Sequence, residues 1–267
     1  MHLSRRSSRR LGAAGAVLAA ASLALTGCSN SSDAGSSDSA SGAKQSIKIF
    51  AAASLQGPLD TVAKDFTAAH PDYSVDPIVY DGSQALATQA IDGADVDVFA
   101  FASEKSLEPV TSAGLTKDVK IFASNTLEIA VAPGNPKKIA SLQDLTKSGT
   151  SVVVCASEVP CGQATDKVTK AADLTLKPVS EETNVTSVVN RVAQGEADAG
   201  LVYATDVKAA GDKLEGVDFD GADDAVNKYP VAVNPKGKST AGGEAFEQYL
   251  LSDEGQKTLT EAGFGKP

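Results

Sequence analysis

Histidine and cysteine are scarce in this 267-residue sequence, which has two histidines and three cysteines. A serine hydrolase needs a base beside its nucleophile, and a structural zinc site needs four Cys or His ligands. His70, which precedes Pro71 and is expected to close a helix at the surface, is the only histidine beyond the N-terminal segment. No G-x-S-x-G motif is present, and the adjacent carboxylates Glu181 and Glu182 are expected to face solvent in a loop. We therefore expect neither an enzyme nor a zinc protein.

Positive charge is also in short supply. The chain has 24 Lys and Arg against 34 Asp and Glu, a formal net charge of −10. Four of the basic residues are arginines within residues 1–27, and without that segment the net charge is −14. An acidic chain is not attracted to nucleic acids or to anionic lipid surfaces. Local geometry, not overall charge, must therefore hold any anionic ligand.

The longest apolar run, from Leu11 to Leu25, is too short and too rich in alanine for a comfortable membrane span. It follows the four arginines and ends in Leu25-Thr26-Gly27-Cys28, which resembles the lipobox of bacterial lipoproteins. That resemblance implies a signal peptide over 1–27, a lipid anchor on Cys28 and a place on the extracytoplasmic face of the cell membrane. An ordinary secretory signal is the alternative. The Ser, Gly and Asp content of residues 28–45 predicts a disordered tether.

The other two cysteines, Cys155 and Cys161, stand close together in "VVVCASEVPCGQ". Outside the cytoplasm, such spacing favours a small disulfide loop of modest stabilising effect, because the loop is short. Two free buried thiols are the alternative.

Apolar, β-rich runs alternate with runs of helical period along most of the chain, which predicts an α/β fold. One helix follows the first strand, and another begins at Val185 and ends before Gly195. Two passages with an extended strand followed by a turn, 125–145 and 228–238, lie about a hundred residues apart and enclose a block of that size. We therefore expect two lobes joined by two hinge crossovers, each lobe a mixed sheet flanked by helices, with lobe 1 over 46–126 and 231–267 and lobe 2 over 127–230. The expected strands are Ile47–Ala51, Tyr73–Tyr80, Val96–Ala102, Leu127–Pro133, Ser151–Ala156, Ala199–Ala204 and Tyr229–Asn234.

Four junctions between a strand and a helix carry small or hydroxyl residues. They are Ser54 in "AAASL", Ser83 in "YDGSQAL", the "VPCGQ" turn and "EETNVTSVV" around Val185. The first amides of a helix lack intrahelical partners and carry partial positive charge, so such junctions bind anions without a charged side chain. The alternative is that Ser54 and Ser83 only cap their own helices.

Four segments, "KIFAAASLQGPLDTVAKDF", "YDGSQALATQAIDGADVDVFAFAS", "GLVYATDV" and "YPVAV", resemble the molybdate-binding proteins of bacterial molybdate ABC transporters, a branch of the type II solute-binding proteins. The resemblance covers the chain from Ile47 to its C-terminal helices. It implies a monomer without a cofactor that captures molybdate, and tungstate with it, by closure of the two lobes. It also implies partners in an ABC permease and its ATPase.

The family pattern implies an oxyanion site built from both lobes. Ser54 and Ser83 match the two hydroxyl ligands, Cys161 and Val185 match two backbone amides, and Tyr203 matches a phenol ligand. Many relatives have alanine where this chain has Cys161, a change that a backbone contact tolerates. Hydroxyls, amides and a phenol suit a fully deprotonated dianion, whereas phosphate near neutral pH keeps a proton that needs an acceptor.

Three alternatives remain open at this point. Another oxyanion, such as sulfate, thiosulfate or a phosphonate, would use the same kind of donors. Ferric iron would require paired tyrosines, histidine or carboxylates, and the sequence places only Tyr203 near the junctions. A purely structural or adhesive lipoprotein would need no ligand site.

Overall fold

Two mixed sheets organise residues 44–267, the part of the chain that the computed structural model describes. The predicted signal peptide over 1–27, the lipidation site Cys28 and nearly all of the predicted tether lie outside the described residues. Both sheets carry helices on their faces, which confirms the predicted α/β class. The first sheet has, in order, β4 (Val79–Asp81), β2 (Ile49–Ala52), β5 (Val98–Ala100), β12 (Asn227–Val233) and β6 (Lys117–Asn125). The second has β11 (Glu215–Val217), β7 (Leu127–Val131), β10 (Ala199–Tyr203), β8 (Val152–Cys155) and β9 (Ser180–Glu182).

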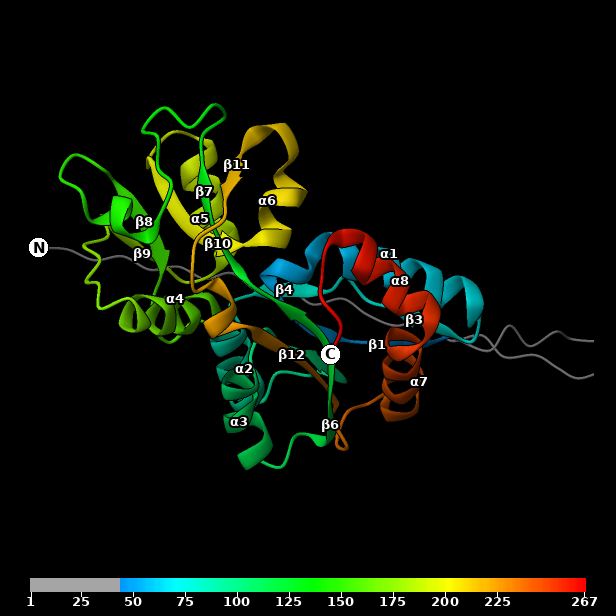
Figure 1. The fold of residues 1–267 in the computed structure, drawn as a ribbon. Helices are drawn as coiled ribbons and strands as arrows, with labels where there is room; N and C mark the ends of the chain where they lie inside the picture. The colour runs from blue at the N-terminus through cyan, green and yellow to red at the C-terminus, as the bar shows by residue number, and fades with distance from the viewer. Residues whose placement is uncertain (1–43) are drawn as a thin grey trace, which may run out of the picture. The chain divides into compact units, whose positions relative to one another are not determined.

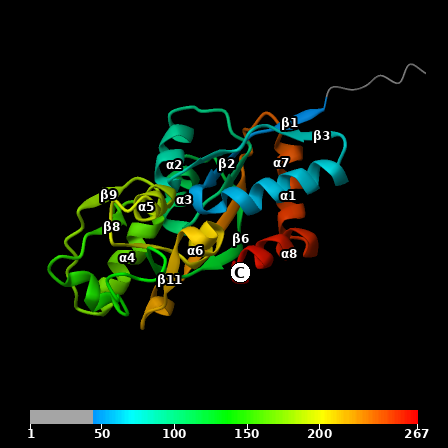
Figure 2. The same cartoon turned by 90° about the horizontal axis from the view of Figure 1, so that it is seen from above.

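The first lobe consists of the first sheet and the helices on both its faces. Side chains alternate along a strand, so Ile49 and Ala51 of β2 point to one face and Phe50 points to the other. Phe246 packs in the core on the first of these faces and Leu86 in the core on the second. The helices are α1 (Gln56–Ala69), α7 (Thr240–Leu251) and α8 (Asp253–Ala262) on one face, and α2 (Ser83–Ile91) and α3 (Glu104–Ser112) on the other. Figure 2 shows these two groups of helices on opposite sides of the sheet.

The second lobe consists of the second sheet with its own helices and a separate hydrophobic core. β8 runs parallel to β10 and β9, while β7 runs antiparallel to β10 and β11. The apolar face of the helix predicted from Val185 is buried at Val188 and Val192. The helices of the second lobe are α4 (Pro160–Ala171), α5 (Val185–Ala193) and α6 (Ala204–Ala210). Short 3-10 turns are η1 (Ala53–Leu55), η2 (Leu142–Thr146), η3 (Gly211–Lys213) and η4 (Ala222–Ala225).

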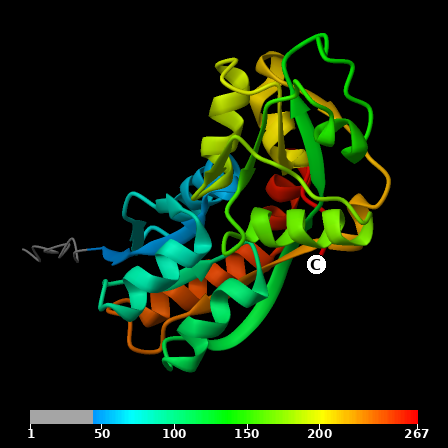
Figure 3. The same ribbon diagram turned by 90° about the vertical axis from the view of Figure 1, so that its left-hand side faces the viewer.

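The chain crosses between the lobes twice. Only Thr126 separates β6 of the first lobe from β7 of the second. The return passes through η4 into β12, which begins at Asn227, so the expected return at 230/231 falls inside this strand. In Figure 1 the second lobe lies above the first, with green β6 and orange-brown β12 at the crossing, and Figure 3 shows the same two bodies from the side.

Several strands differ from the sequence-based expectation, among them the one expected over Ile47–Ala51, which is two strands, β1 (Gln45–Ile47) and β2. β6, β9 and β11 were not expected, because the first four residues of β6 are exposed and the other two are three-residue edge strands. The single strand expected over Tyr73–Tyr80 is two, β3 (Tyr73–Val75) and β4, separated around Pro77. β3 pairs with β1 (Gln45–Ile47), which begins inside the predicted tether. Glu181 and Glu182, expected in a loop, lie in β9, where Glu182 binds Arg191 Nε at 2.6 Å.

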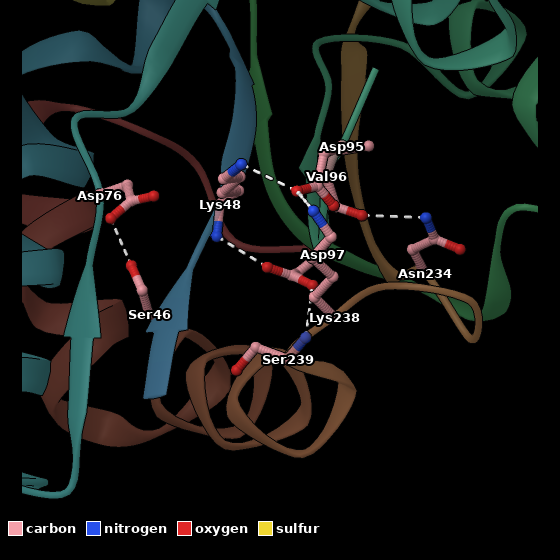
Figure 4. A network of polar contacts seen from close by, with 9 residues as sticks. All are labelled: Ser46, Lys48, Asp76, Asp95, Val96, Asp97, Asn234, Lys238 and Ser239. Atoms are coloured by element: carbon pink, nitrogen blue, oxygen red, sulfur yellow. Dashed lines mark hydrogen bonds and ion pairs between the residues drawn. The ribbon is translucent and has the colours of Figure 1, made fainter. Parts of the chain in front are cut away.

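Asp97 is a buried carboxylate, 1% exposed, at the end of the first sheet where β2 and β5 begin. Figure 4 shows it among its neighbours. Its Oδ2 accepts from Lys48 N at 2.9 Å, and its Oδ1 accepts from Ser239 N at 2.8 Å. One side chain therefore ties β2 to the turn before α7.

We expect Asp97→Ala to destabilise the fold by about 3–4 kcal/mol, because two charge-assisted hydrogen bonds are lost and two amides lose their acceptors. Urea unfolding measures this change. The neighbouring Asp95→Ala is the control, since Asp95 pairs only with Lys48 and Lys238, whose side chains are 44% and 80% exposed. Such pairs contribute less than about 1 kcal/mol. Equal losses in the two variants would contradict the assignment of the central role to Asp97.

Candidate oxyanion-binding site

The five residues implied by the family resemblance all line one small cavity between the lobes. Ser54 lies in η1 and Ser83 is the first residue of α2, both in the first lobe. Cys161 and Val185 lie in the first turns of α4 and α5, and Tyr203 ends β10, all in the second lobe. The cavity measures about 10 Å³, the space of a single water-sized sphere. A tetrahedral oxyanion therefore enters only if the lobes separate.

The two serine side chains do not cap their own helices. The N-cap positions of α1 and α2 belong to Leu55 and Gly82, and neither helix has a side-chain cap. The Ser83 hydroxyl, fully buried, accepts a hydrogen bond from Ala102 N at 3.1 Å. Since that bond occupies a lone pair, the single hydroxyl proton is left to donate elsewhere. The simple capping alternative is therefore wrong for both serines.

Backbone amides contribute from the second lobe. The first-turn amides of α4 and α5, including those of Cys161 and Val185, have no intrahelical acceptor. The side chain of Asn184 accepts from Ser187 N at 3.0 Å and so fixes the start of α5. Both helices exceed eight residues and begin at the cavity wall. Their dipoles add partial positive charge at this wall.

Tyr203 is accompanied by a second tyrosine that the sequence analysis did not place here. The rings of Tyr203 and Tyr229 lie 6.0 Å apart, and Tyr229 Oη lies 3.0 Å from Ser54 Oγ. Tyr203 Oη accepts from Asn227 Nδ2 at 2.9 Å. Asn227 and Tyr229 both belong to β12, whose apolar run "YPVAV" indicated a strand but not that its first residues bond to the cavity residues Tyr203 and Ser54.

Burial raises the pKa of both phenols above the ordinary tyrosine value, with burial as the largest cause in each case. They therefore stay protonated at neutral pH and act as hydrogen-bond donors. Protonated phenols suit an anionic ligand, whose oxygens accept hydrogen bonds. Within residues 44–267, no three His, Cys, Asp or Glu side chains come together as a metal-binding group.

Asp81 also lines the cavity. The sequence had predicted a wall of hydrogen-bond donors alone, and the carboxylate of Asp81 is an acceptor. Its Oδ1 accepts from Gly82 N at 2.7 Å and from Asn184 Nδ2 at 2.9 Å. The signal for Asp81 was present in "YDGSQ", two residues before Ser83, but its direction was not readable from sequence. Because Asn184 belongs to the second lobe, this bond crosses the cleft.

Cys155 and Cys161 form a disulfide that joins the end of β8 to the first turn of α4. The sequence separation of the two cysteines is 6. Chain-entropy arguments give a loop of this size about 2 kcal/mol of stabilisation. We expect reductant to lower the free energy of unfolding by about this amount. A Cys155→Ala, Cys161→Ala double variant provides the control: its unfolding should not respond to reductant, and a response would show that reduction acts elsewhere.

None of the helices within residues 44–267 has the length and apolar character needed to cross a bilayer.

Two lobes around a small cavity lined by hydroxyls, helix-end amides and a protonated phenol are typical of a protein that binds a small solute. A model of the bacterial extracellular solute-binding protein family matches residues 47–265. The chain is 41% identical over 244 residues to the molybdate-binding protein ModA of Mycobacterium tuberculosis, covering 91% of this chain and 93% of that protein. It therefore belongs to the bacterial extracellular solute-binding proteins, which are transport proteins and not enzymes.

Two further comparisons bear on fold and ligand. The periplasmic molybdate-binding protein of Azotobacter vinelandii superposes with a TM-score of 0.73, covering 83% of this chain and 99% of that one at 20% identity, and so shares the fold. The sulfate-binding protein of Synechococcus elongatus is 25% identical over 269 residues, covering 86% of this chain and 75% of that protein.

Proposed function

We propose that this protein captures molybdate, and tungstate with it, through Ser54, Ser83, Cys161, Val185 and Tyr203. The observation that carries the proposal is the convergence of these five residues, from both lobes, on one cavity. The relative from Mycobacterium tuberculosis, named as a molybdate-binding protein, supports the choice of ligand.

The chemistry of the wall favours an unprotonated dianion. Two hydroxyls, two helix-end amides and a phenol held in its protonated form supply hydrogen bonds to the ligand oxygens. Asp81 Oδ1 already accepts from Gly82 N and Asn184 Nδ2. A protonated phosphate needs an acceptor for its proton, whereas the five proposed ligand groups act as donors, so phosphate should bind more weakly than an unprotonated dianion.

Sulfate is the second candidate, because it is also an unprotonated tetrahedral dianion and because a sulfate-binding protein is among the relatives. The two ligands differ in size, and the lobes set the size by how far they close. Tungstate has nearly the size of molybdate, so the site should not separate these two.

Titration calorimetry with molybdate, tungstate, sulfate and phosphate tests the proposal on the chain from residue 28 carrying Cys28→Ser. We expect molybdate and tungstate to bind at least about 100-fold more tightly than sulfate, a difference of about 2.7 kcal/mol. Equal binding of sulfate would replace molybdate by sulfate as the ligand. Absence of heat from all four would remove the oxyanion proposal.

In the full assembly, the protein acts as a lipid-anchored monomer on the extracytoplasmic face of the membrane and delivers its ligand to an ABC permease driven by an ATPase. The sequence Leu25-Thr26-Gly27-Cys28 supports the anchor. Mass spectrometry of the mature chain should find an acylated N-terminal cysteine at Cys28. A mature N-terminus at another residue would contradict it.

A further inference from the structure

The lobes meet at one edge of the cavity through five residues, which we call the lobe latch: Asp81, Gly82 and Gln84 of the first lobe and Thr183 and Asn184 of the second. Asn184 Nδ2 donates to Asp81 Oδ1 at 2.9 Å, and Gln84 Nε2 donates to Thr183 O at 3.0 Å. Both bonds cross the cleft. Asp81, Gly82 and Asn184 also line the cavity itself.

Gly82 is the steric centre of this contact. A Cβ atom built on it would overlap the carbonyl oxygen of Thr183, far inside van der Waals contact. Its φ of −59° and ψ of 131° are open to any residue, so the backbone conformation does not require glycine at this position. The added Cβ would also meet the amide group of Gln84, but this is the end of a flexible side chain, whereas the Thr183 carbonyl of the other lobe is backbone. The requirement for glycine therefore comes from Thr183, and it exists only while the lobes are closed.

The latch is continuous with the ligand groups on both sides. Gly82 directly precedes Ser83, which lines the cavity, and Asn184 directly precedes Val185, whose amide belongs to the proposed site. Asn184 uses its two ends differently: Nδ2 bonds Asp81, and Oδ1 accepts from Ser187 N to start α5. An oxyanion that draws Ser83 and the start of α5 together therefore brings the latch residues into contact as well.

We infer that the lobe latch sets how long the ligand stays bound, with Asp81, Gly82 and Asn184 acting as positioning residues that hold the closed form. This inference rests on the proposed function. Association takes place on the open form, where Gly82 and Thr183 are apart, so the latch governs dissociation and leaves association unchanged.

Stopped-flow binding of molybdate to Gly82→Ala tests the inference on the chain from residue 28 carrying Cys28→Ser. We expect dissociation to accelerate at least about 100-fold, because an added Cβ blocks closure, with association unchanged within about threefold. Small-angle scattering should show that molybdate compacts the unaltered protein but not Gly82→Ala. Gly57→Ala is the matched control, since a Cβ there meets nothing within 4 Å, and it should leave both rates unchanged.

A second pair of variants tests the bond between Asp81 and Asn184 without adding an atom next to Ser83. Asp81→Ala removes the acceptor for Asn184 and should accelerate dissociation about tenfold, whereas Asp81→Asn keeps an acceptor oxygen in place and should restore slow dissociation. Unfolding in urea checks that the variants fold alike.

Three results would overturn the inference. Unchanged dissociation in Gly82→Ala, with molybdate still bound by the unaltered protein, removes the latch and leaves the proposed function standing. Slower association at an unchanged dissociation rate would place the effect on the open form instead. If the unaltered protein binds none of the oxyanions, the proposed function fails and this inference fails with it.

Discussion

Ser83→Ala should weaken molybdate binding about 100-fold, as measured by titration calorimetry. The Ser83 hydroxyl is fully buried, and its lone pair already accepts from Ala102 N at 3.1 Å, so its proton is available to a ligand oxygen. A hydrogen bond to a charged group contributes about 1.5–3 kcal/mol, and the upper part of this range corresponds to a 100-fold change. The same substitution leaves the buried Ala102 amide without an acceptor, which should cost about 1–3 kcal/mol of stability.

The two effects of Ser83→Ala are separated by two further serine variants. Ser54→Ala should lose affinity to a similar degree and less stability, because its partner is the Tyr229 hydroxyl, which also lies 3.4 Å from Asn125 Nδ2. Ser252→Ala removes the N-cap of α8, far from the cavity, and should lose about 1 kcal/mol of stability with unchanged affinity. If Ser83→Ala binds molybdate as tightly as Ser252→Ala does, Ser83 is not a ligand.

The candidate site was largely predictable because its parts sit at strand-to-helix junctions that sequence patterns mark. A β-rich run that ends in a small residue before a helical run locates Ser54 and Ser83 without knowledge of the fold, and the start of a helical run locates Val185. Their convergence follows from the rule that ligands bind beyond the carboxyl ends of strands. What the family resemblance added was the choice of Cys161 and Tyr203 among many similar positions.

Contacts made across the cleft were not predictable. Asp81 lines the cavity and bonds Asn184, which is 103 positions away in sequence. Asn227 and Tyr229 bond the cavity residues Tyr203 and Ser54, which are also remote in sequence. Local periodicity carries no information about which strand end faces another lobe. For the same reason the polar first half of β6 gave no strand signal, since its pairing with β12 comes from a segment about a hundred residues away.

Asp206 should make stability fall as the pH rises, opposite to the usual behaviour of a carboxylate. Burial raises the pKa of Asp206 to about 7, although the bond from Tyr203 N at 2.9 Å opposes this shift. In the unfolded chain the value is about 3.9. Between these two pH values the folded state binds more protons, so stability is full below about pH 4, declines toward pH 7 and is constant above it. The lowered pKa values of Asp95, Asp144 and Asp198 act in the other direction and only at lower pH.

Asp206→Asn isolates this effect, because asparagine keeps an oxygen that accepts from Tyr203 N but does not ionise. Urea unfolding from pH 4.5 to 7.5 should show the stability of the variant, relative to the unaltered protein, rising by about 3 kcal/mol across this range. Parallel curves across this range would contradict a raised pKa.

Asp206 also faces the groove beside Ser54, together with Asp60 of α1 and Lys208 of α6, and its charge acts on the Tyr203 phenol in the cavity. Since a bound dianion disfavours a nearby carboxylate, molybdate should bind more tightly at pH 6 than at pH 8, and Asp206→Asn should remove this dependence.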